Sequence, residues 1–143
     1  MQSTPIKILL TNLVAIHLVG NLWHGDAHVT LEVFLPDIKT AFVIVVILIG
    51  PMLGSILTWT RYVISGLWVV GVSMVGSLVF SVYHHYVLIS PDNVDHLPPG
   101  TPSAHMNFSD SALFIALIAL ITALFAFYAA GRLQSNGSGI PHT

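Results

Sequence analysis

The chain contains no cysteine and very little formal charge. Only 7% of its 143 residues are Asp, Glu, Lys or Arg, whereas 55% are hydrophobic. The absence of cysteine excludes disulfides, thiolate metal sites, iron–sulfur clusters and thiol nucleophiles. Soluble domains of this size carry about 25% charged residues. A surface so poor in charge is suited to lipid, and we expect the lipid bilayer to be the protein's main surroundings.

Motifs of common enzyme and nucleic-acid-binding classes are also missing. The net charge is -2 and no basic cluster is present, so we expect no nucleic-acid partner. There is no nucleophile elbow, phosphate-binding loop or dinucleotide motif. The isolated chain is therefore not expected to be an enzyme, although a metal-dependent oxidoreductase subunit is compatible with it.

Four long runs without formal charge divide the sequence. A helix needs about 20 mostly apolar residues to cross the hydrocarbon core of a bilayer. The first run is followed by no small-residue cleavage pattern, so we expect it to be retained as a span. The predicted fold is all-α, a polytopic four-transmembrane-helix bundle that forms one membrane domain over residues 1–133, followed by a flexible tail over 134–143. The expected spans are 5–28, 38–60, 62–89 and 110–131.

Local signals refine the helix boundaries. Thr4-Pro5 is a helix cap followed by proline, and Ser109 or Asp110 is the expected cap of the fourth helix. Gly50-Pro51 lies inside the second span and predicts a kink. The proline-rich segment 90–108 is expected to be an irregular loop. Residues 29–35 either extend the first helix or lie along the membrane interface.

Lysine and arginine predict the orientation. With four spans both termini lie on one side, together with Lys7, Arg61 and Arg132, and only Lys39 lies on the other. The positive-inside rule then places both termini in the cytoplasm. All six acidic residues fall on the opposite, extracytoplasmic side.

Histidines gather on that same side. His24 and His28 end the first span, and His84 and His85 end the third, which runs in the same direction. At about 100° per residue, His24 and His28 share one helical stripe with His17 and Asn21. Because His84 and His85 are adjacent, one of them is expected to point inward. A polar stripe in a membrane helix faces protein or water rather than lipid.

This pattern predicts a transition-metal site. Two histidines four residues apart on a helix chelate one ion, and a third imidazole from His84 or His85 completes a common set. Acidic residues near the face supply a fourth ligand or fix an imidazole tautomer. Nitrogen and oxygen ligands favour Zn, Cu(II) or Fe(II). The predicted metal ligands are His24, His28, His84, His85, Glu32, Asp92 and Asp95.

Other functions fit the same pattern. A b-type heme would be ligated by His17 or His24 on one helix and by His84 or His85 on the other, and a chlorophyll would need one histidine. His17 also fits a neutral imidazole bonded to Asn21 or to a facing serine, or a proton or cation route in an oligomer. The small size equally suits a non-catalytic accessory subunit, so a homo-oligomer or a larger membrane complex is expected.

Overall fold

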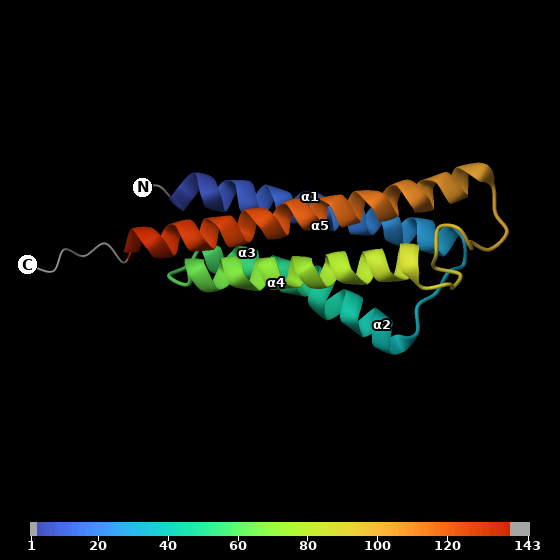
Figure 1. Ribbon diagram of the computed structural model, residues 1–143, viewed down its shortest axis with the longest axis horizontal. Helices are drawn as coiled ribbons and strands as arrows, with labels where there is room; N and C mark the ends of the chain where they lie inside the picture. The colour runs from blue at the N-terminus through green and yellow to red at the C-terminus, as the bar shows by residue number, and fades with distance from the viewer. Residues whose placement is uncertain (1–2, 138–143) are drawn as a thin grey trace, which may run out of the picture.

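The predicted all-helical class is confirmed by the structure, a computed structural model that describes residues 3–137 (Figure 1). Within these residues there are helices and no strands, and four helices are long and apolar enough to cross a membrane. The second of these spans is continuous over three helical elements. The elements in chain order are α1 (Ser3–Thr30), α2 (Asp37–Phe42), the π-helix η1 (Val43–Ile49), α3 (Gly50–Thr58), α4 (Val63–Val82), the π-helix η2 (Tyr83–Val87) and α5 (Pro102–Gly137).

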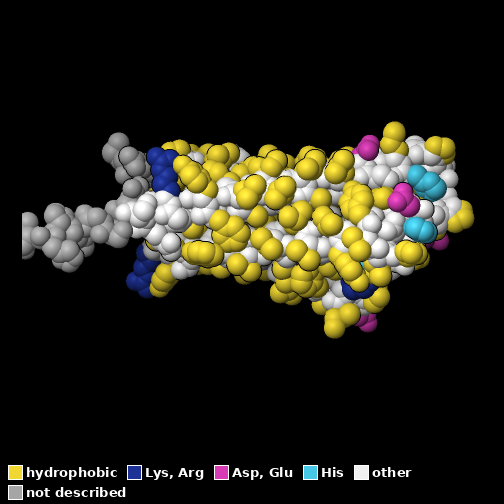
Figure 2. All heavy atoms as spheres, viewed as in Figure 1, with side chains coloured by type: hydrophobic (Ala, Val, Ile, Leu, Met, Phe, Trp, Pro, Cys, Tyr) yellow, Lys and Arg dark blue, Asp and Glu magenta, His cyan; other side chains and the backbone are white. Residues whose placement is uncertain are grey.

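The four spans form an elongated bundle. α4 packs against α3 and α5, and α5 also packs against α1. Figure 1 shows that α1 begins and α5 ends at the same end of the bundle. Lys and Arg side chains gather near that end, whereas Asp, Glu and His side chains gather near the other, which we call the histidine end (Figure 2). The two ends therefore differ in charge as the sequence predicts.

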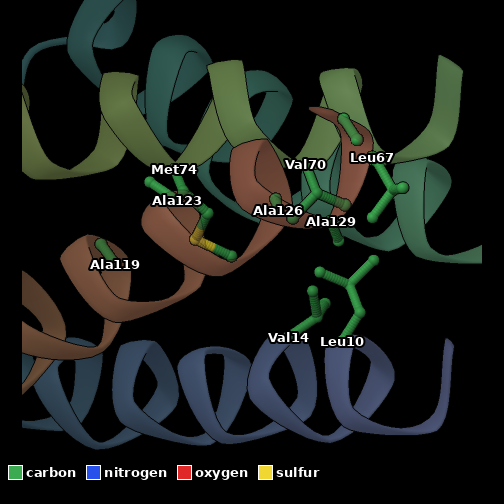
Figure 3. Close-up of a cluster of buried hydrophobic side chains, with 10 residues drawn as sticks. Leu10, Val14, Leu67, Val70, Met74, Ala119, Ala123, Ala126 and Ala129 are labelled. Atoms are coloured by element: carbon green, nitrogen blue, oxygen red, sulfur yellow. The ribbon is translucent and has the colours of Figure 1, made fainter. Parts of the chain in front are cut away.

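The central core is built from small and branched side chains of three helices (Figure 3). Leu10 and Val14 of α1 meet Val70 and Met74 of α4, and alanines of α5 fill the space between them. Alanine lets helix backbones approach closely, which favours helix association in a membrane. The alanines buried in this core are Ala119, Ala123, Ala126, Ala129 and Ala130.

Close backbone contact also holds α3 against α4. A Cβ atom added to Gly54 would lie 2.9 Å from the carbonyl oxygen of Gly66, and one added to Gly66 would lie 2.7 Å from the amide nitrogen of Thr58. Any larger residue at these two positions would push the backbones apart. The glycines therefore fix the distance between the two helices near the end of the bundle opposite to the histidine end.

The second span is irregular at the predicted position. Pro51 has no N–H and cannot bond the carbonyl of the preceding turn, and the turns directly before it form the π-helix η1. The path of the span changes here, so that α2 slopes away from α4 (Figure 1). Gly50-Pro51 thus separates a segment that packs tightly, α3, from one that diverges.

α5 is longer than expected at both ends. It begins at Pro102 rather than near 110, so the second half of the predicted loop is helical. Thr101 provides the cap, because its Oγ1 accepts the N–H of Ala104 at 3.2 Å and Pro102 occupies the first helical position. At its other end α5 continues past 131 to Gly137; the remainder of the predicted tail, 138–143, lies outside the described residues.

Segment 29–35, whose path the sequence left open, turns away from α1 at its end. The N–H of Val33 bonds the carbonyl of His28 at 2.9 Å, and the N–H of Glu32 bonds the carbonyl of Val29 at 3.2 Å. These two bonds form a Schellman motif. Glu32 occupies its left-handed position with a φ of 54°, where glycine is usual. The motif ends the helix and fixes the Val33 carbonyl beneath His28.

Candidate metal centre

Three imidazoles converge at the histidine end. His24 and His28 come from successive turns of α1, and His85 comes from η2. The Nε2 atom of His24 lies 3.1 Å from Nε2 of His85 and 3.1 Å from Nε2 of His28. One ring nitrogen from each of the three histidines lies within 4.8 Å of the other two, a spacing that could hold a metal ion. His24 and His85 are buried, and His28 is partly buried.

The other ring nitrogen of each histidine has its own acceptor. Nδ1 of His28 lies 2.8 Å from the carbonyl oxygen of Val33, and Nδ1 of His85 lies 2.9 Å from that of Asp92. A carbonyl only accepts, so both Nδ1 atoms carry the proton. Nδ1 of His24 lies 2.9 Å from Oγ of Ser111, whose own proton is donated to the Phe108 carbonyl at 3.0 Å. Nδ1 of His24 is therefore also the donor.

The same assignment leaves an unprotonated Nε2 on each of the three imidazoles, and Nε2 of His24 lies 3.1 Å from each of the other two. A neutral imidazole has one N–H, so with Nδ1 protonated no proton lies between the Nε2 atoms. Lone pairs at 3.1 Å repel each other unless a cation lies among them. Two nitrogens on a tetrahedral ion, each bonded at about 2.0–2.1 Å, would be roughly 3.3 Å apart. The spacing of the Nε2 atoms is therefore close to the spacing that a small tetrahedral cation requires, and the tautomers are fixed by outer partners, as is usual for histidines that bind metals.

A buried carboxylate stands beside the cluster. Oδ1 of Asp92 lies 3.3 Å from Nε2 of His28 and 3.2 Å from Nδ1 of His85. Neither carboxylate oxygen accepts a hydrogen bond from any group in residues 3–137. A buried carboxylate without hydrogen bonds is costly, and neutral imidazoles do not compensate its charge. A divalent cation among the imidazoles would compensate the charge of Asp92, so the carboxylate fits a metal centre better than a purely structural cluster.

Phe108 covers the cluster on the α5 side. Its ring is fully buried, and its centroid lies 4.9 Å from that of His24, 4.8 Å from that of His28 and 5.6 Å from that of His85. Leu31 and Val33 pack around it in a small apolar core together with Ala27 and Ala104. This layer shields the imidazoles from water and holds their rings in place.

Local helix geometry selects His85 rather than His84 for the cluster. Both residues lie in η2, a π-helical turn of the kind often found at functional sites. His85 points toward His24, and the following loop folds back on it through the bond from the Val94 N–H to the His85 carbonyl at 3.0 Å. His84 instead packs on Phe80, and its Nδ1 lies 3.5 Å from Nζ of Lys39.

The remaining predicted ligands lie away from the three imidazoles. Glu32 and Asp95 are exposed, and neither belongs to the group that could hold an ion. Two further histidines at this end have structural partners. His96 in the loop bonds the side-chain oxygen of Asn93 at 3.3 Å, and His105 in the first turn of α5 bonds the Pro98 carbonyl at 2.9 Å. The structure thus brings His24, His28 and His85 together with Asp92.

His17 lies deeper on the same stripe of α1, apart from the cluster. Its Nε2 lies 3.0 Å from Oγ of Ser77 on α4, and 3.2 Å from the amide nitrogen of Asn21. The side chain is 1% exposed. These contacts match the interpretation of His17 as an imidazole bonded to Asn21 and a facing serine.

An apolar cavity of about 450 Å³ adjoins the cluster and is open on one side. Its walls come mainly from α1, η1 and α4, at the place where α2 slopes away from the bundle (Figure 1). His24, His28 and His85 form part of its lining. The imidazoles therefore have a protein layer with Phe108 on one side and an accessible space on another.

Sequence reasoning missed the groups that fix the imidazoles. Ser111 and Phe108 were placed at the start of the fourth span or in the loop, and the Val33 carbonyl in an undecided segment. The pair Thr101-Pro102 repeats the start signal of Thr4-Pro5, and it would have extended the fourth helix far enough to include Phe108. The Val33 contact had no such signal, because it depends on a left-handed glutamate.

Comparisons with models of protein families, with curated proteins and with solved structures gave no match for this chain.

Proposed function

We propose that the protein is a membrane metalloprotein that binds one transition-metal ion through Nε2 of His24, His28 and His85. The observation that carries this proposal is that the Nε2 atoms of three histidines lie close together, while Nδ1 of each of these rings has a hydrogen-bond acceptor. Three imidazoles with a carboxylate nearby suit Zn, Cu(II) or Fe(II). Three protein ligands also leave a position open for a further ligand, as in catalytic rather than closed structural zinc sites.

The spacing favours a single ion over heme. Axial nitrogens on opposite faces of a heme iron would be roughly 4 Å apart, at about 2 Å per bond, with the macrocycle between them. Nε2 of His24 and Nε2 of His85 are 3.1 Å apart and their rings meet edge to face. The other pairings involve His17, which is bonded to Ser77, or His84, which faces Lys39.

We also propose that the centre faces the extracytoplasmic side. Lys7, Arg61 and Arg132 mark the other end of the bundle, and this distribution supports cytoplasmic termini. The chain has no cysteine, so a single-cysteine variant at exposed Asp95 reports its side without background. An impermeant maleimide should label intact cells that express Asp95→Cys. Labelling only after lysis would show that the centre faces the cytoplasm.

Metal analysis of the purified protein tests the binding proposal. The wild-type protein should contain close to one equivalent of metal, and His24→Ala/His85→Ala should contain almost none, since two of three ligands are lost. The matched control is His96→Ala/His105→Ala, which removes two histidines at the same end that bond only loop groups. Equal metal contents in wild type and His24→Ala/His85→Ala would refute the proposal, and a Soret band would favour heme.

A further inference from the structure

The cavity beside the three imidazoles has the size of a small-molecule site. Its volume is about 450 Å³, and small-molecule pockets are typically about 300–1,000 Å³. Because the three imidazoles line it, a molecule in the cavity would reach a metal held by their Nε2 atoms. What the cavity accepts therefore determines what the metal centre encounters.

Most of the cavity wall offers only hydrocarbon. Val43, Ile47 and Leu48 of η1 form one side, and Phe80 of α4 and Leu35 of the α1–α2 connection contribute to others. None of these side chains has a hydrogen-bonding group. A polar occupant would lose its hydrogen bonds to water along this wall without replacement. The main body of the occupant is therefore an apolar chain or ring.

One buried hydroxyl in the lining has no partner. Oγ of Ser81 on α4 accepts or donates no hydrogen bond within residues 3–137, although the residue is only 2% exposed. A buried hydroxyl in a helix can bond the carbonyl of the preceding turn, as Thr122 does with Ile118 at 2.7 Å, but Ser81 does not. The unbonded hydroxyl of Ser81 and the imidazoles would be matched by an occupant that also has a polar group.

The location of the cavity indicates how such a molecule arrives. α1 packs against α3 and α5, but α2 slopes away from the bundle (Figure 1), and the cavity lies between α1 and η1. Both are membrane-spanning segments. A molecule dissolved in the bilayer enters between the two spans without crossing water.

Together these observations point to the occupant, and we propose that the cavity binds a lipid-soluble amphiphile with a single hydrocarbon chain and an oxygen-containing head group. The head group occupies the open position of the metal and contacts Ser81, while the chain lies against η1. This inference rests on the proposed metal site, because the metal supplies the strongest contact to the head group.

A cobalt-loaded protein with two hydroxamates as probes tests the inference. Co²⁺ accepts the same nitrogen ligands and has visible bands that change when a further ligand binds. Octanohydroxamate and acetohydroxamate have the same chelating head and differ only in chain length. Each would be titrated in detergent against wild type and Ile47→Trp, in which the larger side chain fills the cavity at a residue that is 4% exposed. Retained cobalt is measured after each titration.

The expected result is a loss confined to the long probe. Ile47→Trp should lower the affinity for octanohydroxamate at least about tenfold and change the affinity for acetohydroxamate by less than about twofold, because only the longer chain occupies the cavity. Partition of the probe into detergent cancels, since both proteins are compared in the same micelles. Ile44→Trp is the matched control, because Ile44 lies on the same π-helix with 46% of its surface exposed.

The outcomes separate the two proposals. Absence of cobalt bands in the wild type overturns the metal site and this inference together. Normal cobalt bands with equal effects of Ile47→Trp on the two probes overturn the amphiphile site alone. If Ile47→Trp fails to fold, which its own cobalt spectrum reveals, Val43→Phe fills the same wall with a smaller change and must show the same selective loss.

Discussion

The central core and the histidine end are buried by different means. In the core, Leu10, Val70 and Met74 meet a row of alanines through contacts without direction. At the histidine end, Nδ1 of His24, His28 and His85 each has an acceptor. Oγ of Ser111 accepts from His24 and donates to the Phe108 carbonyl. The core depends on volume, whereas the histidine end depends on the position of individual lone pairs and protons.

This difference shows which changes each region tolerates. A core without polar atoms accepts any apolar side chain of suitable size. A buried polar network loses stability as soon as one member lacks its partner. Asp92 is the exception in the network of the histidine end, because its carboxylate lacks hydrogen bonds. The comparison therefore predicts that core variants alter stability and network variants alter metal affinity.

Ala126→Leu should give the largest effect on stability. Ala126 is fully buried between the helices of the core, and extra methylenes in a packed core cost about 1–3 kcal/mol. The free energy of unfolding, measured by denaturant titration in mixed micelles, should fall by that amount, while metal affinity of the folded fraction should not change. Ala41→Leu, at an exposed site on α2, is the control. A fall in metal affinity would show that the two regions are coupled.

Ser111→Ala should weaken metal binding with a smaller change in stability. Without the hydroxyl, the proton of His24 moves to Nε2, where it bonds a neighbouring imidazole and must be displaced by the metal. Loss of such an outer partner lowers affinity about 10–100-fold, or about 1.4–2.7 kcal/mol. Competition with a chromophoric chelator measures this. Ser77→Ala removes a buried serine that bonds His17 and should leave affinity unchanged; an equal loss there would contradict the assigned role.

Asp92→Asn should affect the metal-free and metal-bound protein in opposite directions. It removes a buried charge without hydrogen bonds, so the metal-free protein should gain roughly 1 kcal/mol of unfolding free energy. Metal affinity should fall about tenfold, because a compensating charge beside the ion is lost. Thermal melting with and without metal tests both signs, with exposed Asp95→Asn as the control. Lower stability in both states would show that Asp92 is balanced by another group.

Glu32→Gly should give the smallest effect. Glycine adopts the left-handed conformation of this position without a steric penalty, but it has more freedom when unfolded, so a net gain below about 1 kcal/mol is expected. Metal affinity should stay constant because the Glu32 side chain is exposed. Denaturant titration and metal competition measure the two quantities. A marked loss of affinity would make Glu32 a ligand after all.

The sequence was sufficient for the fold because a bilayer imposes few choices. Charge-free runs of spanning length must be helices, and the stripe of His17, His24 and His28 follows from helical periodicity. The kink at Gly50-Pro51 was likewise visible, since proline disrupts the preceding turn. These features depend on residues near one another in the chain.

The candidate site was only partly predictable because its contacts are distant or irregular. His24 and Ser111 are 87 positions apart in the sequence, so no local pattern joins them. The π-helical turn at η2 alters the angle between successive residues, which makes a choice between His84 and His85 from ideal periodicity unsafe. The position of Asp92 beside the cluster depends on how the loop after η2 folds back onto His85.

The contact between Gly54 and Gly66 lies far along the bundle from the three imidazoles. It holds α3 tightly against α4, whereas η1 and α2, which continue the same span, diverge from α4 toward the histidine end. A small change in the angle between α3 and α4 at this contact becomes a larger displacement at α2. A bulkier residue at Gly54 should therefore enlarge the entrance of the cavity beside the imidazoles, although Gly54 is not among the residues that line this cavity.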